Sequence, residues 1–231
     1  MSESPFASHV VFTLGPVPVT MTVVVTWAIM ALLVAAALLI KRRLQLEAGT
    51  AQSVAELFCE TVDAQIAGAM QADPAPYRAL VGTLFIFILT ANWSSLVPGV
   101  EPPTAYLETD AALALIVFVA TIYFGIRSNG LGGYLKNFAR PSWVMIPLNL
   151  VEQVTRAFSM MVRLFGNVMS GVFVIGIVLS LTGLLVPIPL MALDLLTGAI
   201  QAYIFAVLAT VFIAASVSEG GEADKSRERE P

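Results

Sequence analysis

The sequence is poor in the residues on which most redox, metal and catalytic sites depend. It has a single cysteine, Cys59, and a single histidine, His9. One cysteine excludes an internal disulfide and any CxxC metal or redox motif. Because the only histidine stands in the N-terminal segment and no HExxH occurs, a Ser-His pair or a zinc protease inside a membrane is excluded as well. We therefore expect no metal, no cofactor and no catalytic chemistry of the chain's own.

Charge and strand-like patterning are also scarce. Only 12% of the 231 residues are charged, the net charge is -4, and no basic block suited to nucleic acid is present. Alternation of apolar and polar residues is absent, so helices rather than a β-barrel must satisfy the backbone in an apolar solvent. These absences exclude a nucleic-acid-binding protein and a membrane barrel.

Apolar residues are abundant instead. They make up 58% of the chain, and the mean hydropathy is +0.84. The apolar blocks are long enough to cross roughly 30 Å of hydrocarbon, which takes about 20 helical residues. The first block has no Lys or Arg before it and no A-x-A-like site after it, so we interpret it as a retained helix and not as a signal peptide.

The order of these blocks predicts an all-α membrane protein with a single membrane domain over residues 1–231. We expect about three ordinary transmembrane helices followed by a long, strongly tilted two-helix hairpin. The apolar run from Ile146 to Thr182 would be about 50 Å long as a helix, which exceeds the bilayer core. The expected parts are a first transmembrane helix 17–40, a transmembrane hairpin 79–126, the long hairpin 146–217 and a disordered polar tail 218–231.

Basic and acidic residues fall on opposite sides of this topology. A basic triplet, residues 41–43, closes the first span, whereas the loop 97–110 carries only acidic charges. Arg127, Lys136 and Arg140 follow the third span. Because basic loops stay in the cytoplasm, we expect a multi-pass protein with its N-terminus outside and its C-terminus in the cytoplasm.

An amphipathic pattern replaces the apolar one between residues 51 and 70. Apolar side chains recur every four residues from Val54 to Met70, and Glu56, Glu60 and Asp63 occupy another face. Two interpretations stay open. The segment is a helix on the membrane surface, or a helix packed on a partner, because an acidic face is not one that binds lipid.

A polar stripe runs along the first helix of the long hairpin. Its members are separated by three or four residues, which places them on one helix face. They are Glu152, Arg156, Ser159, Arg163, Asn167 and Ser170. Glu152 and Arg156, at i and i+4, are placed for a surface salt bridge.

Arg163 differs from its neighbours on the stripe. It has no acid three or four positions away, and a guanidinium stays protonated at physiological pH. A centred charge costs about 2.5 to 3.5 kcal/mol on insertion scales, so the expectation is a functional group that faces water or a partner. The alternative is a permanent ion pair with Asp194 on the next helix.

The second helix of the hairpin has its own polar face, formed by Asp194, Thr197 and Gln201. Two such helices joined by a tight turn are able to line one wet path. Asp194 is the only acid of that apolar run. It either carries or relays a cation, or is merely solvated at the membrane boundary near the turn.

Several stretches together resemble one family. RLFGN, at Arg163–Asn167, is preceded by PLNLVEQVTRAFSMMV and followed by QAYIFAVLATVFIAAS. Weaker similarity extends through PPTAYLETDAALAL and FGIRSNGLGGYLKNF, so that it covers most of Ala79–Ser218. In these motifs the chain resembles the a subunit of the bacterial rotary F-type ATP synthase.

The resemblance implies a stator in the bacterial inner membrane, with ATP synthesis and H⁺ or Na⁺ transport as its setting. Its implied partners are a ring of c subunits that each carry a membrane carboxylate, b-type peripheral stalk subunits, the rest of the complex and the lipid bilayer. Two ion half-channels would meet the ring on either side of Arg163, which matches the family's essential arginine. Asn167 and Gln201 match polar positions beside it.

Two positions depart from the family pattern. Val172 stands where many relatives have a glutamate, and Asp194 stands where some have a histidine. We therefore hypothesise that a carboxylate has moved from one helix to the other while the channel stays titratable.

A stand-alone secondary transporter or channel is the alternative function. Transporters usually show paired repeats and helices interrupted at the midplane. Neither feature is evident in the sequence.

Overall fold

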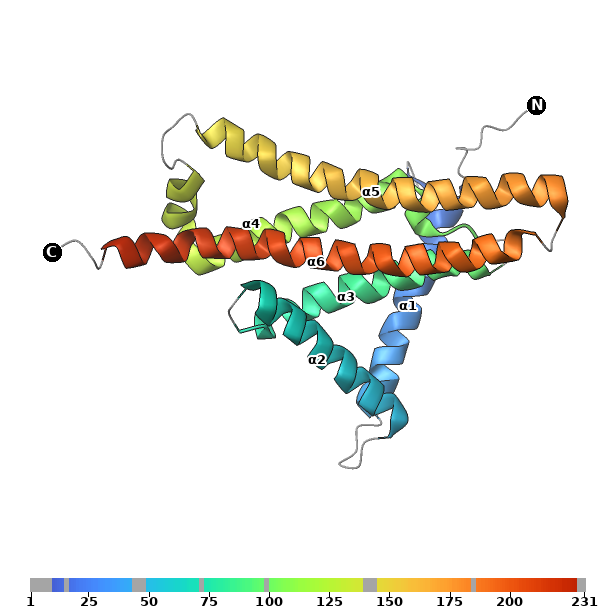
Figure 1. Cartoon of the computed structure of the whole chain (residues 1–231), viewed down its shortest axis with the longest axis horizontal. Helices are drawn as coiled ribbons and strands as arrows, with labels where there is room; N and C mark the ends of the chain where they lie inside the picture. The colour runs from blue at the N-terminus through green and yellow to red at the C-terminus, as the bar shows by residue number, and fades with distance from the viewer. Residues whose placement is uncertain are drawn as a thin grey trace.

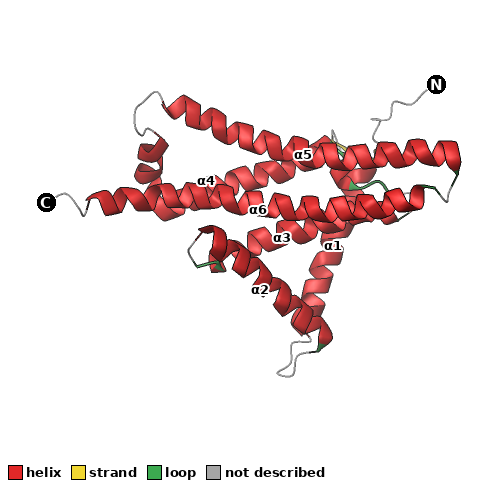
Figure 2. Ribbon diagram, viewed as in Figure 1, coloured by secondary structure: helices red, strands yellow, loops and turns green. Residues whose placement is uncertain are grey.

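The structure of the chain, a computed structural model, describes residues 10–14, 17–42, 49–70, 73–97, 100–138, 145–183 and 186–227. His9, Arg43 and Arg140, which the sequence argument used, lie outside the described residues. The described part is mainly helical, as Figure 1 and Figure 2 show, with one short β-hairpin and connecting loops.

Six α-helices make up most of the described chain. Five of them, α1, α3, α4, α5 and α6, are long and apolar enough to cross a membrane, which agrees with the predicted all-α membrane class. The bounds are β1 Val10–Leu14, β2 Val17–Thr20, α1 Met21–Arg42, α2 Thr50–Met70, α3 Ala75–Trp93, η1 Ser94–Leu96, η2 Pro103–Ala105, α4 Leu107–Phe138, α5 Met145–Thr182 and α6 Pro187–Arg227.

The first membrane helix starts later than the sequence predicted. We expected it to begin at Val17, whereas α1 begins at Met21 and Val17–Thr20 forms the strand β2, antiparallel to β1. Three of the four residues of β2 are β-branched, and such residues favour strands. The fourth, Pro18, has no backbone N–H to donate to a helix.

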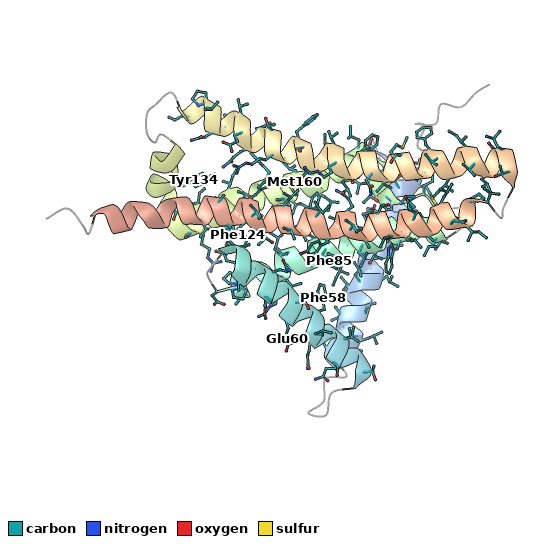
Figure 3. All side chains as sticks on the ribbon, viewed as in Figure 1. Phe58, Glu60, Phe85, Phe124, Tyr134 and Met160 are labelled. Carbon is teal, nitrogen blue, oxygen red and sulfur yellow. The ribbon has the colours of Figure 1, made fainter. Side chains whose placement is uncertain are left out.

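The amphipathic helix α2 packs on the chain itself. Its apolar face joins a core with α3 and α6, and the rings of Phe58 and Phe85 stack with their centroids 5.8 Å apart (Figure 3). Glu60 lies on the exposed side of α2 and points away from this core (Figure 3). Asp63 and Arg78 form an ion pair that links α2 to α3. Thus α3 and α6 are the surface on which this helix packs.

Helix α4 is longer than the span the sequence predicted, and it bends near its end. At Gly130 the backbone has φ 69° and ψ 160°, a conformation that only glycine adopts without strain. Beyond Gly130 a short helical segment turns aside from the main axis (Figure 1). Upstream of it, Asn129 Nδ2 donates to the Ser216 carbonyl oxygen at 3.1 Å and so ties α4 to α6.

The two longest helices form the hairpin at the end of the chain. Helix α5 has 38 residues and α6 has 41. The helical backbone of α6 continues to Arg227, into the segment 218–231 for which we expected a disordered tail. No proline interrupts the chain between Pro189 and Pro231, and the tail contains the helix formers Ala, Glu, Lys and Arg.

One apolar core joins α3, α4, α5 and α6. Helix α5 contributes one narrow face to it, and Met160 in Figure 3 lies on that face. Only 11% of the most apolar window of α5 is buried, against 44% for α6. Much of the surface of α5 is therefore free for another partner. The buried core residues include Leu84, Ile88, Leu113, Val117, Met160, Leu164, Val168 and Phe205.

Candidate functional site

The polar stripe of α5 divides between an exposed and a half-buried side. Glu152, Ser159, Arg163 and Ser170 are exposed, and apolar side chains surround them. A charge on such a face is costly against lipid, so this face suits a protein partner or water. Its exposed apolar residues are Val151, Val154, Phe158, Val162, Phe173 and Ile177.

Arg156 already has partners within the chain. It forms an ion pair with Glu152, as their i, i+4 spacing allowed. Its guanidinium carbon also lies 5.3 Å from the centroid of the Phe212 ring on α6, a cation-π contact. These contacts hold Arg156 at the hairpin and give it a structural role.

Arg163 lacks such partners. It is exposed, and within the described ranges it forms no ion pair. The alternative of a permanent pair with Asp194 is therefore not what the structure contains. Arg163 is thus an exposed cation, unpaired in the described part of the chain, in the middle of an apolar helix face.

Asp194 turns instead into the contact between α5 and α6. Its carboxyl group lies directly against Gly171, so close that a Cβ built on Gly171 would lie 2.8 Å from Asp194 Cγ. Only a residue without a side chain allows this approach. Asp194 is half-buried there, so it is not simply solvated beyond the end of the helix. Its carboxyl lies beside the residue that precedes Val172.

Arg163, Asn167 and Gln201 lie at one level of the hairpin. Helices α5 and α6 are antiparallel, and the Asp194 and Phe212 contacts described above set their register. Between these contacts, the turn that contains Arg163 and Asn167 comes opposite residues 199–203 of α6. Gln201 stands in the middle of that stretch and is 7% exposed. The structure therefore places these three residues at one level of the hairpin, with Arg163 exposed and Gln201 buried.

Two functional candidates were missed by the sequence argument, Asn92 and Thr104. Asn92 Nδ2 donates to the Gly198 carbonyl oxygen at 2.8 Å, and Thr104 Oγ1 donates to Asn92 Oδ1 at 2.6 Å. Both side chains are buried. They tie α3 and η2 to α6 one turn before Gln201. An amide at the end of an apolar helix was the only signal in the sequence.

A cavity of about 180 Å³ opens between η1, the following loop and the hairpin. Asp194 lines it, together with Ser95, Glu101 and Val172. Because carboxylates and a hydroxyl stand on an otherwise apolar wall, the cavity suits water and cations. It reaches from the loop that follows α3 to the place where Asp194 meets α5.

Glu101 also lines a neighbouring cavity of about 630 Å³, which Tyr106, Glu108 and Phe165 border as well. The Tyr106 hydroxyl donates to the Glu101 carboxylate. Burial raises the pKa of Tyr106, and this hydrogen bond raises its pKa further. Tyr106 therefore stays a protonated donor at neutral pH and orients Glu101 toward the two cavities.

Comparison with known proteins decides the family of this chain. The family model described as "ATP synthase A chain" matches residues 21–214. The chain is 52% identical to "ATP synthase subunit a 2" of Bradyrhizobium sp. (strain BTAi1), over 94% of this chain and 97% of that protein. It is 45% identical to "ATP synthase subunit a" of Albidiferax ferrireducens, over 84% of this chain and 85% of the relative.

The chain belongs to the ATP synthase A chain family. Similarity continues in "ATP synthase subunit a 1" of Chlorobaculum parvum, at 46% identity over 87% of this chain and 90% of that protein. Members of this family are membrane-sector subunits of the F-type ATP synthase and are not themselves catalytic. The rest of that complex is therefore the partner, and ATP synthesis and ion transport are the setting, as the sequence predicted.

Proposed function

We propose that this chain is the stator of the membrane sector, where it couples H⁺ or Na⁺ translocation to rotation of a ring of c subunits. The observation that carries the proposal is Arg163. It stands mid-way along α5 on an exposed apolar face, without an ion-pair partner in the described part of the chain. The missing partner is then a carboxylate on each ring subunit in turn.

The physics of this arrangement is self-consistent. A ring carboxylate that passes Arg163 is favoured in its ionised form, because a nearby positive charge lowers its pKa or repels a bound cation. Beyond Arg163 the carboxylate must load an ion before it enters lipid, since a bare charge there is costly. The same guanidinium repels a cation that would leak directly between the half-channels. A membrane potential then drives rotation with about 2.3 kcal/mol per charge per 100 mV.

One half-channel leads through the cavity that Asp194 and Glu101 line. From Asp194 the path continues to Gln201 and Asn167, which hydrogen-bond without adding charge. The position of the Asp194 carboxyl beside Gly171 supports the hypothesis that it replaces the glutamate absent at Val172. Ser170, exposed on the same stripe of α5, is the remaining polar group of this path.

The topology we propose follows from the charges and the number of spans. If all five candidate spans cross, the start of α1 and the end of α6 lie on opposite sides of the membrane. The loop with Glu101 then faces outside, whereas the C-terminal end of α6 faces the cytoplasm of a bacterium. We further propose that the α5/α6 hairpin lies strongly tilted along the ring, and that b-type stalk subunits bind elsewhere on the chain.

Reconstitution tests the stator against a stand-alone transporter. The purified chain alone in liposomes is expected to give no H⁺ or Na⁺ uptake under a potential, because the essential carboxylate belongs to another subunit. Addition of the c-ring should produce flux, measured with a pH-sensitive dye and with ²²Na⁺. Uptake by the chain alone would identify a transporter and defeat the proposal.

Asp194→Asn tests the relocated carboxylate. The variant keeps the size of the side chain but does not titrate. Ion-driven ATP synthesis in vesicles should fall at least about tenfold, less than the roughly 10²–10⁴-fold that a positioned proton-transfer group contributes, because water still enters the cavity that Asp194 lines. Asp73→Asn, an exposed acid in the turn before α3, is the matched control and should be silent. Full synthesis in Asp194→Asn would show that the channel does not use this group.

A further inference from the structure

Asp110, in the first turn of α4, has no place in the function proposed so far. Its side chain is 0% exposed. Neither Oδ1 nor Oδ2 accepts a hydrogen bond in the part of the chain that the structure describes. In the sequence it is one of the acidic charges of the loop 97–110. Its burial is therefore a property that only the packing of α4 reveals.

The contact between α4 and α5 shows which turn of α5 lies opposite Asp110 along the helix axes. The two helices are antiparallel. A small cavity of about 20 Å³ lies between them, C-terminal to Asp110 along α4. If α4 is followed one turn back from that cavity, Asp110 comes opposite the turn Leu164–Val168 of α5. The cavity is lined by Ala114, Val117 and Thr121 of α4 with Arg156, Ala157 and Met160 of α5.

The contact between α4 and α6 places Asp110 at the same depth in the bundle. Helices α4 and α6 run parallel, and Ser216 Oγ donates to the Thr121 carbonyl oxygen at 2.9 Å. Followed back along both helices, Asp110 comes level with Phe205, about one turn from Gln201. Asp110 is therefore at the depth of the polar group around Gln201, and it reaches this depth from a different helix.

The turn of α5 opposite Asp110 contains a second unsatisfied polar group. Asn167 Nδ2 is buried and donates to no acceptor among the described residues. A carboxyl group without a donor and an amide without an acceptor thus occur at one level of the α4/α5 contact. Buried polar groups of native proteins normally have partners, so such exceptions point to a group that changes state or holds a ligand.

A route to the outside reaches the same place. The Asp110 backbone N–H donates to the Tyr106 carbonyl oxygen, and Tyr106 borders the cavity of about 630 Å³. Phe165 and Met169, which flank Asn167 on α5, line that cavity too. The cavity therefore ends within one helical turn of both unsatisfied groups.

We propose that Asp110 is an occluded proton-binding carboxyl on the outer half of the ion path, between the Glu101 cavity and the Arg163 face of α5. A bare carboxylate among apolar side chains is unfavourable, so Asp110 rests in the neutral, protonated form. Its proton comes from water in the cavity and leaves toward a ring carboxylate opposite Arg163. While Asp110 is ionised, the Asn167 amide donates to it and stabilises the anion. This inference rests on the proposed stator function.

A proton fits this site better than a metal cation does. Hard cations need several oxygen ligands, whereas the buried residues near the level of Asp110 on α4 and α5 are the apolar Leu113, Ala114, Leu164 and Val168. The Asn167 nitrogen is a donor and not a ligand. Na⁺ would lack a coordination shell here.

Asp110→Asn and Asp110→Thr test the proposal in vesicles that contain the assembled membrane sector without its soluble head. Both variants remove the titratable group at nearly constant volume. Passive proton flux from the outer side is expected to fall at least about tenfold in each, less than the roughly 10²–10⁴-fold that a positioned proton-transfer group contributes, because Glu101 and Asp194 remain on the path. Asp73→Asn is the exposed control. Unchanged flux in an assembled variant would overturn the proposal, as would failure of both to assemble, because Asp110 would then be structural.

A pH profile separates proton transfer from a packing role. The flux of the unmodified protein should show a step with outer pH that the Asp110 variants lack. The other charged groups around this end of α4 are Glu101 and Glu108 at the cavity, Arg163 on α5 and Asp194 on α6, and all remain in the variants. If the variants showed a smaller proton flux but kept the step with outer pH, Asp110 would have a packing role only. Transport of ²²Na⁺ without any proton flux would also overturn the inference.

Arg163→Ala in vesicles that contain the complete complex, soluble head included, keeps this test separate from that of the stator itself. Coupled synthesis that survives in Arg163→Ala defeats the stator assignment, and with it the role of Asp110. Normal proton flux in Asp110→Asn, with coupling lost in Arg163→Ala, defeats the role of Asp110 alone.

Discussion

Arg163→Ala is expected to abolish ion-driven ATP synthesis in membrane vesicles, by at least about a hundredfold. The guanidinium is the only charge that stands exposed at the centre of α5, and without it a ring carboxylate has no reason to release its ion at that point. An ion can then cross between the half-channels without turning the ring. ATP hydrolysis by the soluble head should persist, because its catalytic groups are on other subunits.

Two further variants make this result specific. Arg163→Lys should also fail, since lysine is a point charge that deprotonates more readily when desolvated. Arg78→Ala removes an exposed arginine that pairs with Asp63 at the other end of the bundle, and surface pairs of this kind contribute about 0–1 kcal/mol. It should therefore synthesise ATP normally. Synthesis at the normal rate in Arg163→Ala would remove the basis of the proposed mechanism.

Gly171→Ala is expected to reduce coupled synthesis about tenfold or more. The added Cβ would meet the Asp194 carboxyl, so either that side chain rotates away or α5 and α6 separate. Overpacking of this kind costs about 1–3 kcal/mol of stability, and a shift of Asp194 away from α5 would interrupt the proposed ion path. The methyl group changes no charge, so the loss would report the position of Asp194 and not its chemistry.

Gly68→Ala is the matched control. Gly68 is also helical, on α2, and a Cβ built on it meets nothing within 4 Å. It should leave both assembly and synthesis unchanged. The two variants are compared in complexes with equal c-ring content, by the rate of ATP synthesis under an imposed potential. If Gly171→Ala synthesises ATP as well as Gly68→Ala does, the close contact between α5 and Asp194 is not required for synthesis.

The ends of the helices show where prediction from sequence reached its limit. The apolar content of residues 146–182 was enough to predict α5, because an apolar run of that length has few other stable forms in lipid. Val17 was misassigned because β-branched residues suit both a membrane helix and a strand. Pairing with Val10–Leu14 decided between the two. The helical end of α6 likewise had no apolar signal, since its residues are polar.

The same division holds for the candidate site. Arg163 stood out because a charge inside an apolar run is unfavourable whatever the fold. Asp110 did not, because an acid at the start of a helix is ordinary, and only the packing of the folded chain removes it from water. Asn92 was similar, since its role depends on the Gly198 carbonyl oxygen far along the chain.

The sequence by itself determined that this protein is a bundle of membrane helices with a fixed cation at the centre of one of them. Length, apolarity and charge are local properties of a segment, and they do not depend on its neighbours. Only the tertiary structure decided which polar groups meet, because contacts between α4, α5 and α6 join residues far apart in sequence. It placed Asp194 against Gly171, left Arg163 facing outward, and enclosed Asp110 away from water.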